Sequence, residues 1–142
     1  NGQRYEPALR FFEAAEAAAH DAQLKAEAQR MAAKVRFFPS PLQDVDRARA
    51  AFASSLATSR LDRRPAAVGT YLVTLGDWAA MELHFGDWAC GQRLLQLAAH
   101  AAPRTSLLDG RGVMARMIAN MGTSAARAAD QPADGCPVAP PA

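Results

Sequence analysis

Histidine is the residue type in this chain best suited to metal binding or to acid–base chemistry near neutral pH. The three copies, His20, His84 and His100, lie far apart, and none has a Cys or a carboxylate at the intervals typical of zinc sites. We therefore predict no metal site. These side chains are expected at a helix joint, in a groove and at a helix end.

The other residues able to do chemistry also lack a catalytic arrangement. The sequence contains no phosphate-binding glycine loop, no G-x-S-x-G nucleophile elbow and no H-E-x-x-H metal motif. Glu13 with Glu16, and Asp44 with Asp46, are carboxylate pairs by sequence proximity alone, and such pairs on exposed helix faces serve solvation and capping. The expectation is a non-enzymatic protein with no catalytic residue and no cofactor.

Two cysteines, Cys90 and Cys136, allow one disulfide bond. Such a bond would pin the C-terminal tail to the helix that carries Cys90 and would indicate an oxidising compartment. A count of two without a secretion signal carries little weight, so we expect two unpaired thiols, one of them packed as a small apolar side chain.

The elements that would position these residues are helices, because one helical motif recurs three times. A small residue is followed four positions later by a large apolar one, and three positions after that by another small one, in 5–15, 45–55 and 88–98. The first small residues of the copies lie 40 and then 43 residues apart. A period in this range is typical of helical repeat arrays.

The motif has a physical reason, because two antiparallel helices need a small side chain where they cross and a large one a turn away. The expected crossing points are Ala8, Ala48 and Gly91. The expected groove fillers are Phe12, Phe52 and Leu95.

The third copy resembles the second helix of a tetratricopeptide repeat. Gly86 and Asp87 precede it as a helix end and a cap, and Pro103 closes it. The resemblance covers about residues 1–127 and is closest to the longer-period variety found in bacterial regulators and signalling scaffolds. It implies an all-α fold, an antiparallel helix-hairpin repeat array of about six helices; a HEAT-like or irregular hairpin array fits the same spacing.

Composition agrees with one helical domain, expected over residues 1–129. Half of the 142 residues are apolar, alanine dominates, and Val, Ile and Tyr are few. The first two expected helices are joined at His20 and Asp21; the alternative is one continuous helix that extends to Phe38. The Pro-rich and Ala-rich stretch 130–142 is expected to be a flexible tail. The expected helices span 4–19, 22–37, 42–59, 65–85, 87–101 and 106–128.

The resemblance also implies an inner groove lined by the first helix of each pair, with small or apolar side chains. Such a surface suits the apolar face of a partner helix or an extended peptide. We therefore predict a protein-interaction scaffold or adaptor; the alternative is an integral structural or regulatory part of a larger bacterial multiprotein complex. The predicted partner-binding residues are Arg30, Phe37, Val73, Gly76, Ala80, Leu83 and His84.

Charge and hydropathy exclude two classes of partner at this stage. A net charge of +2 is too mild for a nucleic-acid-binding protein. No apolar run approaches the length of a membrane span, so no membrane insertion is predicted. No signal-peptide pattern opens the chain, but a start without methionine makes that absence uninformative about the compartment, for which the cytoplasm is slightly favoured. The chain starts at Asn1 with a helix that lacks its mate. We therefore expect a missing upstream segment and exposure of Phe11 or Phe12.

Overall fold

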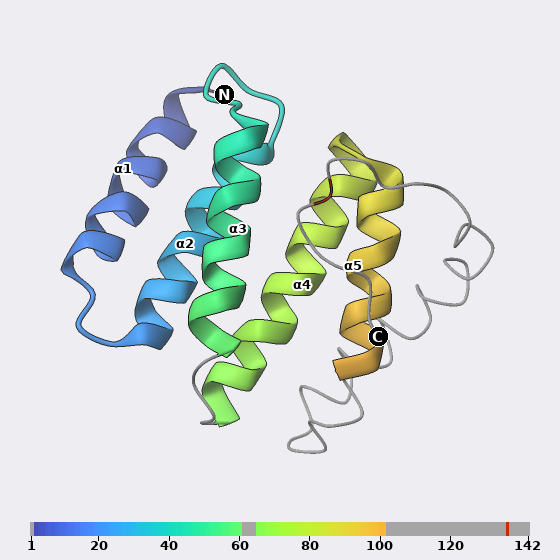
Figure 1. The fold of residues 1–142 in the computed structure, drawn as a ribbon. Helices are drawn as coiled ribbons and strands as arrows, with labels where there is room; N and C mark the ends of the chain where they lie inside the picture. Colours follow the sequence, from blue (N-terminus) through green and yellow to red (C-terminus); the bar gives the residue numbers. More distant parts are fainter. Residues whose placement is uncertain (1, 61–64, 102–135, 137–142) are drawn as a thin grey trace. The chain divides into compact units, whose positions relative to one another are not determined.

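The computed structural model describes residues 2–60, 65–101 and 136, and all regular secondary structure in them is helical (Figure 1). This confirms the predicted all-α class. The predicted helix 106–128 and, apart from Cys136, the tail 130–142 lie outside the described residues, and the repeat array stays a prediction. The helices are α1 (Gly2–Ala18), α2 (Ala22–Phe37), α3 (Val45–Arg60), α4 (Pro65–Phe85) and α5 (Trp88–Ala101).

Aspartate side chains start three of these helices. Asp21 is the N-cap of α2 and its Oδ1 accepts from the backbone N of Gln23 at 2.7 Å. Asp44 and Asp87 act in the same way before α3 and α5. Since a cap satisfies a backbone donor that the helix leaves unpaired, Asp21 separates α1 from α2 and a continuous helix to Phe38 does not form.

The loop between α2 and α3 is held by hydrogen bonds to backbone carbonyls of α2. The N–H of Asp44 donates to the carbonyl of Arg36 at 2.8 Å, and Nε2 of Gln43 donates to the carbonyl of Phe37 at 3.2 Å. These bonds satisfy the last carbonyls of α2, which ends before Pro39 as predicted. Because Asp44 serves as the cap, α3 begins at Val45, three residues later than expected.

The chain divides into two compact units, Asn1–Thr74 and Leu75–Ala142, whose boundary falls inside α4. In the first unit α1 packs on α2 and α2 packs on α3 (Figure 1). Its core is built from alanines and a few large apolar side chains. The buried apolar residues of this unit are Ala26, Ala28, Ala32, Ala33, Phe37, Ala48, Phe52, Leu56 and Leu72.

A buried hydroxyl seam joins the helices of the first unit. Oγ of Ser55 donates to the carbonyl of Ala26 at 2.7 Å and lies 3.2 Å from Oγ1 of Thr74. Oγ1 of Thr74 also donates to the carbonyl of Thr70 at 2.7 Å. Ser55 on α3 therefore meets α2 on one side and the first half of α4 on the other.

In the second unit, α5 packs on the second half of α4 through a glycine. A methyl group at Gly91 would stand 2.7 Å from Cγ of Leu83 and 3.1 Å from the carbonyl oxygen of Ala79. This close approach confirms Gly91 as a helix crossing point. The buried apolar residues of this unit are Leu75, Trp78, Ala79, Cys90, Leu94, Leu95 and Ala98.

Among the residues that the structure describes, no helix has both the length and the apolar character needed to cross a membrane.

Candidate functional site

An open apolar groove of about 440 Å³ lies between α1 and α2 in the first unit. Its walls are mainly alanine, with three larger apolar side chains. Leu24 stands at its rim with 63% of its surface exposed. The lining residues are Phe12, Ala15, Ala18, Ala19, His20, Asp21, Leu24, Glu27, Ala28 and Met31.

The groove coincides with the first copy of the recurring motif. In the second copy Ala48, Phe52 and Ser55 are each fully buried. In the third copy Gly91, Leu95 and Ala98 are buried as well. The equivalent residues of the first copy are only half-buried: Ala8, Phe12 and Ala15. The same motif is thus covered in two copies and partly open in the first.

Neighbouring helices explain this difference. Ser55 in the second copy is enclosed by Ala26 of α2 and Thr74 of α4. Its equivalent in the first copy, Ala15, lines the groove together with α2 residues such as Met31. Within the described residues, α1 has a neighbouring helix, α2, on one side. In contrast, α3 has α2 on one side and the first half of α4 on the other.

Side-chain bonds hold the two walls of the groove together. Arg36 on α2 forms a salt bridge with Glu13 on α1. Nε2 of Gln29 donates to Oε1 of Glu16 at 3.1 Å. Since these bonds tie the second half of α1 to α2, the groove is a preformed surface.

The polar lining of the groove is acidic. Of the ten lining residues, Asp21 and Glu27 carry carboxylates and none is Lys or Arg. Oε1 of Glu27 accepts from Oγ1 of Thr70 at 3.2 Å, and Oε2 lies 3.5 Å from a guanidinium nitrogen of Arg30. The groove therefore combines apolar walls with two carboxylates of fixed position.

Two of the predicted partner-binding residues lie on α2. Arg30 is beside the groove, with its side chain 13% exposed and paired with Glu27. Phe37 is fully buried, and its ring centroid lies 6.4 Å from that of Phe52. The guanidinium carbon of Arg49 lies 5.8 Å from the Phe37 ring centroid. This geometry gives Phe37 a core role in the first unit, and it lines no open surface there.

The remaining predicted residues lie on α4. In the first unit, Val73 is half-buried. In the second, Gly76 and Ala80 are half-buried and His84 is exposed, while Leu83 packs against Gly91. Leu83 therefore helps to hold α5 in place. Around Gly76, a methyl group would meet no atom within 4 Å, so the backbone there faces open space.

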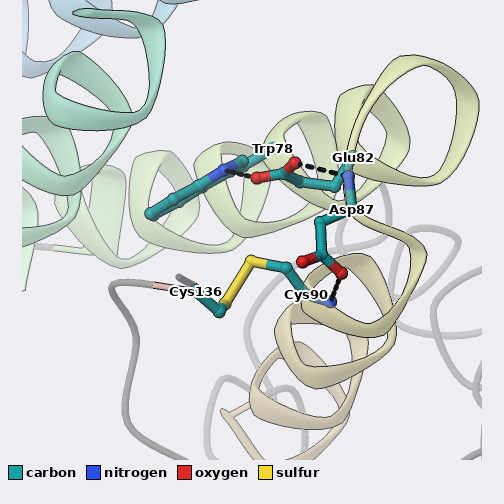
Figure 2. The surroundings of a disulfide bond; sticks show 5 residues. All are labelled: Trp78, Glu82, Asp87, Cys90 and Cys136. Atoms are coloured by element: carbon teal, nitrogen blue, oxygen red, sulfur yellow. Dashed lines mark hydrogen bonds between the residues drawn. A yellow bond between two sulfur atoms is a disulfide. The ribbon is translucent and has the colours of Figure 1, made fainter. Parts of the chain in front are cut away.

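The second unit contains a buried carboxylate that the sequence reading did not assign. Glu82 is fully buried; its Oε2 accepts from Nε1 of Trp78 and its Oε1 from the backbone N of Asp87, both at 3.0 Å (Figure 2). Oδ1 of Asp87 in turn accepts from the backbone N of Cys90 at 3.0 Å. The network fixes the turn between α4 and α5.

The expectation of two unpaired thiols was wrong. Cys90 and Cys136 form a disulfide bond with their Cα atoms 5.2 Å apart (Figure 2). Cys90 is fully buried in the first turn of α5, and the bond joins residues 46 positions apart. Composition alone could not reveal this pairing, because it depends on the fold bringing the two Cβ atoms together.

Potential metal ligands do not gather in the described part of the chain: no group of three His, Cys, Asp or Glu side chains is placed to hold an ion. His20 lines the groove, while His84 and His100 are exposed on α4 and α5.

Sequence reasoning missed most of the groove. It placed the binding surface on α2 and α4, whereas the open apolar lining comes from α1 and the other face of α2. The available signal was the first motif copy, whose residues Phe12 and Ala15 line the groove. The expected exposure of Phe11 or Phe12 is confirmed for Phe11, which is 68% exposed.

Comparison of the chain with protein-family models, with curated proteins and with solved structures returns no match. The resemblance to the tetratricopeptide repeat family therefore stays a prediction, and the function must be argued from the site itself.

Proposed function

We propose that this chain is a non-enzymatic protein-interaction scaffold, built as an antiparallel helix-hairpin array, that presents a preformed groove to a helix or peptide of another protein. The observation that carries the proposal is the groove between α1 and α2, with its apolar walls and volume of about 440 Å³. Apolar grooves between helices are a recurring means of capturing amphipathic partners.

The lining favours binding over catalysis. Seven of the ten lining residues are alanine, leucine, methionine or phenylalanine. Its polar groups are engaged in structure: Asp21 caps α2, and Glu27 pairs with Thr70 and Arg30. Apolar area removed from water supplies affinity at about 25 cal/mol per Å² before the costs of association, so an apolar lining supports binding.

The alternative is a permanently assembled subunit of a larger complex. Phe11 on α1 supports it, since its large aromatic side chain is 68% exposed and offers apolar area that a neighbouring subunit would cover. Phe11 does not line the groove. It does lie at the groove's edge, one turn before Ala15 on the same face of α1, with its ring centroid 5.6 Å from that of Phe12. The two proposals therefore differ in whether the main partner contact falls within the groove, at Leu24, or beyond its edge, at Phe11.

A crossed pair of substitutions separates them. Leu24→Gln removes an exposed apolar side chain from the groove, and Phe11→Gln removes one from α1 beyond the edge of the groove. Both residues are more than half exposed, so neither change should unfold the chain. Each tagged variant is purified from cells that produce the protein, salt-washed to remove charge-mediated passengers, and its partners are quantified by mass spectrometry.

For a groove scaffold, Leu24→Gln should reduce the retained partner about tenfold, equivalent to about 1.4 kcal/mol, while Phe11→Gln, beyond the edge of the groove, has a smaller effect. The reverse pattern would support the assembled subunit and reject the groove. Equal retention by both variants and the unchanged chain would reject both surfaces.

A further inference from the structure

We propose that the groove between α1 and α2 takes an amphipathic α-helix of a partner protein whose first turn carries Lys or Arg. This inference rests on the proposed function and names the chemistry of the partner at the same site.

The motif copies argue that the partner is helical. Phe52 and Ser55 on α3 are buried with α2 packed against them, and α2 runs antiparallel to α3 (Figure 1). On α1 the equivalent residues, Phe12 and Ala15, line the open groove. A helix placed against α1 as α2 is placed against α3 would cover them.

The groove walls are shaped for a helix. Ala15, Ala18 and Ala19 come from α1 and Ala28 comes from α2. Small side chains of this kind let helix axes approach to about 8–10 Å, and larger side chains of the incoming helix would fill the spaces between them. Phe12, Leu24 and Met31 supply apolar contacts to those side chains.

Charge argues for a basic partner. The whole chain has a net charge of +2, yet the groove lining contains two carboxylates and no Lys or Arg. Asp21 stands where α1 ends, and α1 has no basic residue in its last turn, so the partial negative charge of its final carbonyls adds to that end of the groove. The charged side chains that line the groove are thus acidic, opposite in sign to the net charge of the chain.

Two basic residues lie near the groove and do not fill it. Lys25 is exposed and is not among the lining residues. Arg30 is largely buried and meets one oxygen of Glu27 at 3.5 Å, while the Glu27 side chain remains 44% exposed. A further cation can therefore approach Glu27 from the groove side.

The orientation of the partner helix follows from the comparison of α1 with α3. A helix antiparallel to α1 would begin beside the end of α1, where Asp21 lies. Its N-terminal pole and a Lys or Arg in its first turn would then face the carboxylates of Asp21 and Glu27. The partner should carry apolar residues at i, i+3 or i+4, and i+7, after the basic turn.

The test uses four acetylated designed peptides of equal length and identical leucine spacing. Their first turns carry two Lys, two Gln or two Glu, and the fourth repeats the Lys peptide with a central Pro that breaks the helix. Binding to the full chain is measured by fluorescence anisotropy at low and high salt. The matched variant is the Asp21→Asn, Glu27→Gln double substitution, since Asn caps a helix as well as Asp and Gln can still accept from Thr70.

We expect the Lys peptide to bind about fivefold more tightly than the Gln peptide, and the Glu peptide to bind most weakly. High salt and the double variant should each remove this ranking, while Leu24→Gln should weaken all three helical peptides. Circular dichroism confirms that the variants remain folded.

Three other outcomes overturn a defined part of the argument. Equal binding of the Lys, Gln and Glu peptides rejects the basic partner and leaves the groove function standing. If the Pro-containing peptide binds as tightly as the unbroken Lys peptide, the helical partner is rejected. Absence of binding by every peptide, or binding that Leu24→Gln leaves unchanged, rejects the groove as the site and the proposed function with it.

Discussion

Nε1 of Trp78 donates a hydrogen bond to Oε2 of Glu82 at 3.0 Å, one helical turn later on α4, and both side chains are fully buried. The second carboxylate oxygen accepts from the backbone N of Asp87 in the turn before α5. A single side chain thus joins the end of α4 to the start of α5 (Figure 2). Because buried acceptors without partners are costly, we expect this relationship to contribute strongly to the stability of the second unit.

Glu82→Gln should destabilise the chain by about 1–3 kcal/mol. An amide offers one oxygen in place of two, so one of the two donors from Trp78 and Asp87 loses its acceptor and faces an NH₂ group. The free energy of unfolding is measured by urea titration followed by circular dichroism. As a control, the Trp78→Phe variant and the double variant complete a thermodynamic cycle; a coupling energy near zero would show that the Trp78 bond contributes nothing.

Gly91→Ala should destabilise the chain by about 1–3 kcal/mol, although alanine is the better helix former. The added methyl would stand 2.7 Å from Cγ of Leu83 and 3.1 Å from the carbonyl oxygen of Ala79, so α5 would have to move away from α4. Thermal unfolding, with both tryptophans in the second unit as the fluorescent probes, measures the change.

Gly76→Ala is the matched control and should stabilise the chain by about 0.5–1 kcal/mol. This glycine also lies inside a helix, but a methyl group there would meet no atom within 4 Å. A stabilising Gly91→Ala, or a destabilising Gly76→Ala, would contradict the packing described for α4 and α5.

These two glycines also show how far the sequence could be read. The motif identified Gly91 as a crossing point because small residues at a fixed spacing follow directly from helix packing. Gly76 was predicted to line a partner-binding surface, and among the described residues no atom lies within 4 Å of a methyl group placed there. Spacing along one helix predicts which residues share a face, and it does not say whether another element covers that face.

The helices themselves were largely predictable from local signals. Asp21, Pro39 and Asp87 mark helix ends through capping and through the missing N–H of proline, and the structure places ends there. The groove and the disulfide depend on contacts between segments distant in the sequence, and no local signal encodes them. Phe37 illustrates the limit, since it was predicted to line a partner-binding groove and it is fully buried in the first unit.

Reduction of the Cys90–Cys136 disulfide should lower the free energy of unfolding by about 2–4 kcal/mol, because the bond closes a 46-residue separation and restricts the unfolded chain. Urea unfolding with and without dithiothreitol measures the effect. The Cys90→Ala, Cys136→Ala double variant is the control and should show no further response to the reductant. A disulfide of this kind is typical of oxidising compartments, so we expect this chain to work outside the reducing cytoplasm.

Ala80→Arg distinguishes the groove from the surface predicted on α4. Ala80 is half-buried in the second unit and the groove belongs to the first unit, so the added guanidinium should leave partner retention within about twofold of the unchanged chain. Leu24→Gln, assayed in parallel by the same affinity purification, supplies the expected loss. If Ala80→Arg abolishes retention in a variant whose melting temperature is preserved, the partner binds the face of α4 that carries Gly76, Ala80 and His84. In that case the apolar lining between α1 and α2 would serve the packing of the first unit, and the basic-helix inference would fall with it.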